Sequence, residues 1–98
     1  MIVVRDVFRI HPERMKEAAV LAREGKSLVS KSGFGMRRML TDLTGDNYTM
    51  VFETEVADLQ AWQQGMSTVF ADPQWQAWYS RFRPLIAGGR REIFTLLE

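Results

Sequence analysis

Apolar residues open the chain in a pattern typical of a β-strand and then recur at the three- and four-residue spacing of a helix. Residues 2–10 are rich in Ile, Val and Phe, which favours a strand. His11 and Pro12 end this strand, and we expect Pro12 at the first position of a helix over about 12–30. The predicted buried stripe of this helix comprises Met15, Ala18, Ala19, Ala22 and Val29.

The middle of the chain has the pattern of a β-hairpin followed by a second helix. A strand over about 34–42, a turn at 44–47 and a strand over about 48–55 make the hairpin. The helix that follows has an apolar stripe at helical spacing, made of Leu59, Trp62, Met66, Val69 and Phe70.

Asp72 and Pro73 separate this helix from a further short one. Asp72 suits an N-cap and Pro73 the first helical position, which predicts a helix over 73 to about 83. The pair Gly88 and Gly89 is expected to form a turn before a last strand, RREIFTLL. The resulting order predicts a single α+β domain over residues 1–98, ferredoxin-like βαββαβ, with an antiparallel sheet and helices on one face.

Both faces of the first strand carry apolar side chains, which helices on one face of a sheet do not explain. Val4 and Phe8 occupy even positions of residues 2–10, and Val3 and Val7 occupy odd positions. We therefore expect a second copy of the chain to cover the other face, giving a homodimer packed sheet against sheet. The alternative is that the odd-numbered valines are ordinary surface residues.

Two adjacent charges interrupt the same strand. Arg5 and Asp6 must point to opposite faces, and each needs a partner because an unpaired buried ion costs several kcal/mol. Glu53, Arg37 and Arg38 lie in the predicted neighbouring strands and are candidate partners. Two interpretations stay open: a polar pocket that holds a small ligand through arginine and carboxylate groups, or structural ion pairs at a dimer interface.

The helix that begins at Pro73 carries four large rings on one side, at Trp75, Trp78, Tyr79 and Phe82. Each such ring buries roughly 150 to 250 Å². Packing is therefore favoured over an open ligand platform, and Tyr79 is retained as the candidate for the mouth of a cavity.

The amino-acid composition argues against several kinds of functional site and several kinds of binding partner. The 98 residues include no cysteine and one histidine, so neither a metal site nor a thiol nucleophile is expected, and no cofactor is predicted. The net charge of +1 provides no long-range attraction for nucleic acid or an anionic membrane. No apolar run reaches membrane-spanning length, and charges near the start argue against a signal peptide, so a cytoplasmic protein is expected.

The segment DPQWQAWYSRFRPLIAGGRREIF, preceded by RMLTDLTGDNYTMVFETEVADLQAW, resembles NIPSNAP-family proteins of the dimeric α+β barrel superfamily. The resemblance implies a ferredoxin-like protomer and a homodimer whose two sheets face each other to form a barrel. It also implies a cavity between sheet and helices or between the sheets. The superfamily includes quinol monooxygenases, polyketide-tailoring enzymes, stress proteins, members with no assigned activity, and haem-degrading enzymes that hold iron by a helix histidine, which this chain lacks.

Two functional hypotheses follow. The first is a homodimeric, NIPSNAP-like small-molecule-binding protein with a small hydrophobic or aromatic ligand. The alternative is a cofactor-independent monooxygenase or isomerase acting on a small aromatic or quinone-like substrate in the barrel cavity, where a few polar groups stabilise an anionic substrate. The single histidine, His11, is a further candidate for that role, although its position before a helix is more typical of a cap or a solvent-exposed residue. The predicted ligand-binding residues are Arg5, Asp6, Arg37, Glu53 and Tyr79.

Overall fold

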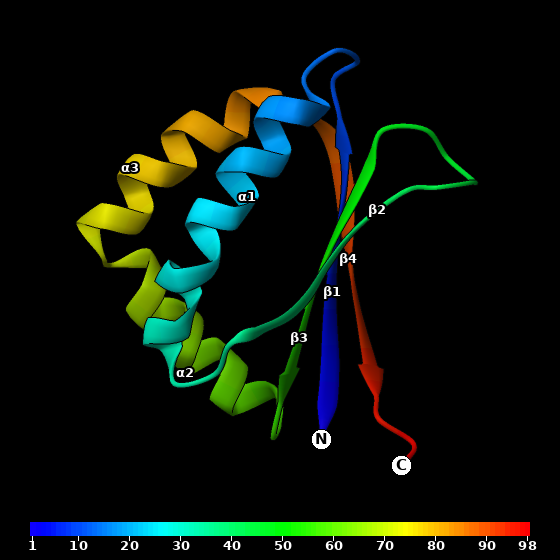
Figure 1. Ribbon diagram of the computed structural model, residues 1–98. Helices are drawn as coiled ribbons and strands as arrows, with labels where there is room; N and C mark the ends of the chain where they lie inside the picture. Colours follow the sequence, from blue (N-terminus) through cyan, green and yellow to red (C-terminus); the bar gives the residue numbers. More distant parts are fainter.

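Four strands and three α-helices follow one another in the predicted order, in a computed structural model that describes residues 1–98. The strands pair antiparallel in the spatial order β2-β3-β1-β4, and Figure 1 shows all three helices on one side of the sheet. The prediction of a ferredoxin-like α+β fold is therefore confirmed. The elements are β1 (Ile2–Ile10), α1 (Met15–Val29), β2 (Met36–Thr41), β3 (Thr49–Val56), α2 (Leu59–Phe70), α3 (Pro73–Phe82) and β4 (Ile86–Thr95), with short 3-10 turns at Ser30–Ser32 and Arg83–Leu85.

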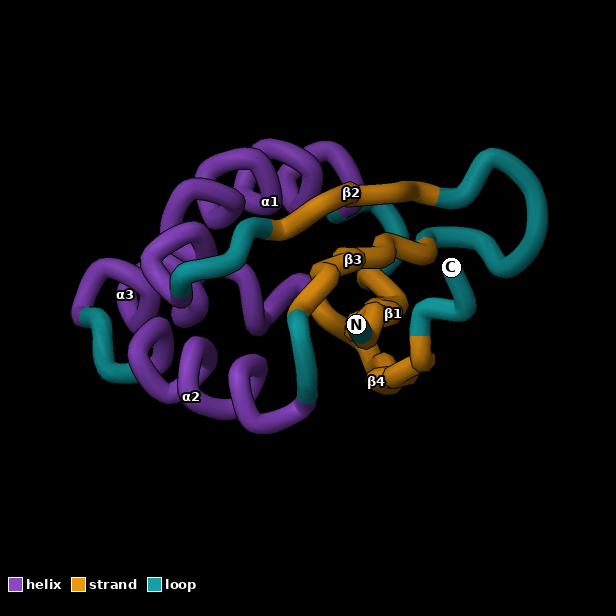
Figure 2. The backbone as a smooth tube through the Cα atoms, turned by 90° about the horizontal axis from the view of Figure 1, so that it is seen from below, coloured by secondary structure: helices purple, strands orange, loops and turns teal.

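Seen from below, the helices form an arc along one face of the sheet, and the β2–β3 loop extends away from them (Figure 2). The opposite face of the sheet is covered by no element of this chain (Figures 1 and 2). None of the helices is long and apolar enough to cross a lipid bilayer.

The main core lies between the sheet and helices α1 and α3. Ile10, Met50 and Phe82 are among its fully buried side chains, and Ala18, Ala22 and Val29 are buried on the predicted stripe of α1. Phe8 packs edge-to-face against both Phe52 and Phe82, with ring centroids 5.2 Å and 5.7 Å apart. The even positions of β1 therefore face the helices.

The first helix begins three residues later than predicted. Pro12 precedes it, Glu13 adopts a left-handed backbone with φ of 71°, and the Arg14 N–H donates to the His11 carbonyl. This turn lets the chain leave β1 and reverse onto the sheet, and Met15 is the first helical residue. The expectation that Pro12 opens the helix was wrong because the turn that follows β1 occupies that position.

The predicted turn at Gly88 and Gly89 was also wrong, because both glycines lie inside β4. A Cβ atom on Gly89 would lie 2.5 Å from the Val7 carbonyl oxygen of the neighbouring strand. Glycine is therefore needed there for close approach of two backbones rather than for a turn. As a result β4 begins at Ile86, and its register with β1 shifts between Arg9 and Ile10.

Candidate functional site

A cavity of about 380 Å³ lies between the helix-facing side of the sheet and the helices. Eleven of its fourteen lining residues are hydrophobic. The lining residues come from all four strands and all three helices. This arrangement gives a largely apolar chamber whose walls are held by the secondary structure rather than by loops.

Helix α3 supplies the aromatic wall of the cavity. Its residues Trp75, Trp78, Tyr79 and Phe82 all line the chamber because their three- and four-residue spacing puts them on one side of the helix. Trp75 stacks on Tyr79 with ring centroids 4.8 Å apart, and Trp78 stacks on Phe82 at 5.0 Å. The indole N–H of Trp78 donates to the Leu21 carbonyl at 2.6 Å, which fixes the ring against α1.

The aromatic residues of α3 serve both packing and cavity lining, which were predicted as alternatives. Trp78 and Phe82 are buried in the core, as predicted, yet the same two rings also form the cavity wall. Tyr79, the ring that was predicted to reach a cavity, does line it.

Asp6 and Arg91 are the two charged residues that line the cavity, and they pair with each other. The two residues stand directly opposite in the β1–β4 ladder, and Arg91 Nε donates to Asp6 Oδ1 at 2.6 Å. The Arg91 guanidinium also lies 4.8 Å from the ring centroid of Trp62 on α2, in the geometry of a cation–π contact. Thr54 on β3 adds a hydroxyl to the lining.

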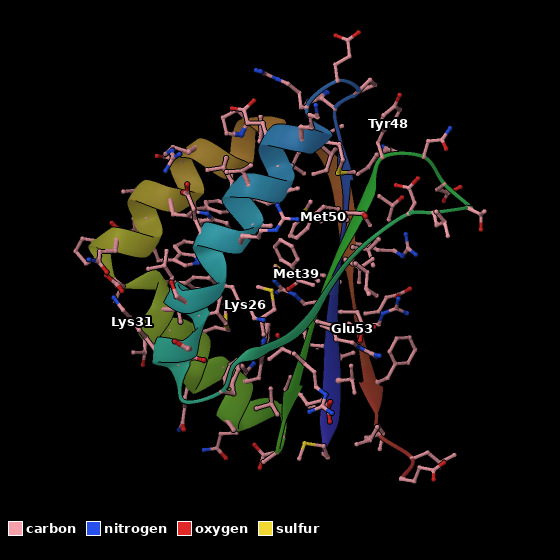
Figure 3. The ribbon with its side chains drawn as sticks, viewed as in Figure 1. Lys26, Lys31, Met39, Tyr48, Met50 and Glu53 are labelled. Atoms are coloured by element: carbon pink, nitrogen blue, oxygen red, sulfur yellow. The ribbon has the colours of Figure 1, made fainter.

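The remaining predicted site residues lie on the opposite face of the sheet. Figure 3 places Glu53 on the side away from the helices and Met39 on the helix side. Arg5 Nε lies 3.0 Å from Glu53 Oε2 without a well-aligned hydrogen bond, and Arg38 Nε donates to Glu53 Oε1 at 2.8 Å. Arg37 pairs instead with Glu55 at 2.5 Å.

The five predicted site residues thus divide between two faces. Asp6 and Tyr79 meet in the cavity, whereas Arg5, Arg37 and Glu53 belong to ion pairs on the outer face. Glu53 is only 7% exposed even though its face is uncovered. Of the two interpretations of these charges, the geometry favours structural ion pairs for the outer group.

Two other candidates lie outside the cavity. His11 is exposed at the end of β1 and is absent from the cavity lining. No group of three or more His, Cys, Asp or Glu side chains is placed to hold a metal ion.

Arg91, Trp62 and Thr54 also line the cavity, although they were not predicted as site residues. The signal for Arg91 was present, since a buried-face Asp6 requires a cation on a neighbouring strand. It was obscured by the predicted turn at Gly88 and Gly89, which left the register between β1 and β4 undefined.

Comparison with known proteins agrees with this fold. The family model described as NIPSNAP matches residues 5–98. A NIPSNAP domain protein from Burkholderia xenovorans is similar in structure, with a TM-score of 0.91 and 22% identity over 98% of this chain and 94% of the other. A NIPSNAP family protein from Agrobacterium tumefaciens strain C58 gives a TM-score of 0.93 with 21% identity over 99% of this chain and 93% of the other.

A more distant likeness is to SnoaB, a cofactor-independent oxygenase from Streptomyces nogalater, with a TM-score of 0.74 and 17% identity over 99% of this chain and 93% of the other. Among curated protein sequences, none matches the chain. At these identities the solved structures establish the ferredoxin-like fold and nothing about chemistry.

Proposed function

The chain belongs to the NIPSNAP family, and we propose that it is a small-molecule-binding protein whose cavity between sheet and helices takes a small aromatic ligand. The observation that carries the proposal is the cavity itself. Its volume of about 380 Å³ falls within the roughly 300 to 1,000 Å³ of small-molecule sites, and such sites are mostly apolar with a few placed polar groups.

The lining suits an aromatic ligand in particular. The half-buried rings of Trp75 and Tyr79 offer stacking and edge-to-face contacts, which add about 0.5 to 1.5 kcal/mol per ring pair beyond the burial of apolar area. The two charged lining residues, Asp6 and Arg91, are bonded to each other, so a ligand with an aromatic body and one polar group matches the lining.

Titration calorimetry with 2-acetonaphthone, a neutral two-ring ketone, tests the proposal. The protein is expected to bind it, and Thr54→Leu is expected to weaken binding at least about tenfold, because the larger side chain fills cavity space at a lining position. Thr41→Leu is the matched control, since Thr41 lies on the same side of the sheet, is exposed and does not line the cavity. Absence of binding, or equal losses in both variants, would contradict the proposal.

The proposal includes a homodimer formed through the outer face of the sheet. That face carries exposed apolar groups such as Leu40 and Phe94 beside arginine and glutamate side chains in similar number. Because these charges are already paired within the chain, the face can pack against its own copy about a twofold axis without burying unpaired ions. A second copy of this chain is therefore the occupant that the face fits best.

A second candidate function is a cofactor-independent oxygenase or isomerase. It is supported by the structural likeness to SnoaB, the cofactor-independent oxygenase, and by the largely apolar lining of the cavity, which would partly desolvate a bound substrate. Consumption of dissolved oxygen by the protein with hydroquinones or polyphenols, measured with an oxygen electrode, separates this candidate from binding alone.

A further inference from the structure

The charges of the cavity cancel within its own wall. Asp6 and Arg91 are its only charged lining residues, and they bond to each other at 2.6 Å, with side chains 25% and 46% exposed. A ligand that enters the chamber therefore meets a neutral pair instead of a free cation. An anionic ligand would have to compete with the Asp6 carboxylate for Arg91 and would lie beside a like charge, which is unfavourable in a partly desolvated site.

The pair nevertheless keeps unused hydrogen-bonding capacity. Arg91 donates one hydrogen bond, through Nε, and its two terminal nitrogens have no protein acceptor. Asp6 accepts at Oδ1, and its Oδ2 has no protein donor. An ionised carboxylate only accepts and a guanidinium only donates. The pair thus presents one acceptor edge and one donor edge side by side.

Trp62 holds Arg91 in this position independently of Asp6. Its ring lies on helix α2 and faces the guanidinium at 4.8 Å, while Asp6 approaches from β1. Because two separate elements fix the arginine, loss of the Asp6 charge is expected to leave Arg91 at the cavity wall with its positive charge uncompensated.

We infer that Asp6 determines the ligand specificity of the cavity: it selects neutral aromatic molecules that carry an N–H or O–H donor next to a carbonyl acceptor, and it excludes aromatic carboxylates. The inference rests on the proposed binding function and specifies its ligand class. The donor of the ligand faces Asp6 and its carbonyl faces Arg91. Asp6 is thus both the hydrogen-bond acceptor for the ligand and the group that neutralises Arg91.

Two nearly isosteric probes measure this selectivity. 2-Naphthamide is neutral and carries a donor and an acceptor on one group, whereas 2-naphthoate is anionic near neutral pH and carries acceptors only. Calorimetry on the wild-type protein at pH 7.5 is expected to show 2-naphthamide binding at least about tenfold more tightly, the factor that one hydrogen bond to a charged group supplies at the low end. Asp6→Asn is expected to reverse the preference, because the freed Arg91 can then bind 2-naphthoate through two parallel hydrogen bonds.

The matched control is Glu24→Gln. Glu24 also forms an ion pair with an arginine, Arg81 at 3.0 Å, but it lies outside the cavity, so this change removes one carboxylate without altering the site. Glu24→Gln is expected to keep the wild-type preference. If Asp6→Asn binds the two probes in the wild-type ratio while 2-acetonaphthone still binds, the specificity inference is overturned and the proposed function stands. If 2-acetonaphthone does not bind the wild-type protein, the proposed function is overturned, and the specificity inference that rests on it is overturned as well.

Discussion

Gly25 stands in the middle of α1, where glycine weakens a helix by about 1 kcal/mol relative to alanine. The structure gives the reason, since a Cβ atom at this position would overlap the indole ring of Trp78. The same ring is fixed by its hydrogen bond to the Leu21 carbonyl and forms part of the cavity wall. Glycine at position 25 therefore lowers the intrinsic stability of α1 but allows α1 to pack closely on α3.

Replacing Gly25 by alanine should consequently destabilise the protein, although alanine is the better helix former. The clash with a fixed, buried ring is expected to lower the free energy of unfolding by about 1 to 3 kcal/mol in urea denaturation. Gly35→Ala is the control, because a Cβ there meets nothing within 4 Å and its effect should stay close to zero. A stabilised Gly25→Ala protein would show that Trp78 is free to move.

For Arg5 and Asp6, the sequence predicts the relative direction of the two side chains but not the partner of each. Strand alternation correctly predicts that they point to opposite faces, because it depends only on backbone geometry. Which of them faces the helices was not predictable, since both faces of β1 are apolar. The partner of Asp6 depends on the pairing with β4, and that register is a tertiary property.

Among the elements, the boundary between α2 and α3 was predictable and the start of α1 was not. Asp72 caps α3 by accepting from the Gln74 N–H at 2.9 Å, and Pro73 is its first residue, as predicted. Pro12 carries the same local signal but lies before the turn that ends β1. Local capping chemistry therefore predicts a helix start only where no tertiary turn competes for the same residues.

Asp72 also links α3 to the 3-10 turn that follows α1. Lys31 Nζ lies 2.7 Å from Asp72 Oδ2, and this hydrogen bond, with the Gln74 N–H, lowers the pKa of Asp72 below its ordinary 3.8. Because its pKa falls on folding, the ionised carboxylate stabilises the fold above about pH 3.8 and loses this contribution as the pH falls through the folded-state pKa.

Asp72→Asn keeps an oxygen for the cap but removes the charge that faces Lys31. The variant should melt below the wild type at pH 7, and the difference in Tm should shrink as the pH is lowered below 3.8. Asp58→Asn is the matched control, because Asp58 caps α2 through the Ala61 N–H and has no lysine partner. A Tm difference for Asp72→Asn that stays constant with pH would exclude the Lys31 interaction as its source.

For the whole molecule, the hydrophobic pattern predicted the element order, the ferredoxin-like fold and a sheet with two apolar faces. It did not locate the cavity, because a cavity depends on how far α2 and α3 stand from the sheet, and no local pattern encodes that distance. The aromatic stripe of α3 therefore gave a correct prediction of packing and an incomplete one of the site.

The proposed homodimer predicts the mass of the protein in solution and its response to substitutions on the sheet. Phe94 is 49% exposed and stands opposite Val3 on the outer face, while its neighbour Ile93 is 44% exposed and stands opposite Val4 on the helix-facing side. Light scattering after gel filtration should give twice the chain mass of 11.3 kDa for the wild type. Phe94→Glu should give the monomer mass, because it buries a charge in the interface, whereas Ile93→Glu should remain dimeric. A wild type that is monomeric at micromolar concentration would exclude the dimer.

The location of a bound ligand tests the central claim most directly. Met36 and Met66 line the cavity from β2 and α2, whereas Val7 and Leu40 lie on the outer face of the sheet. In the complex with 2-acetonaphthone, intermolecular nuclear Overhauser effects should connect the naphthyl protons to the methyl groups of Met36 and Met66. Contacts to the methyl groups of Val7 and Leu40 instead would place the ligand between the sheets and contradict the account.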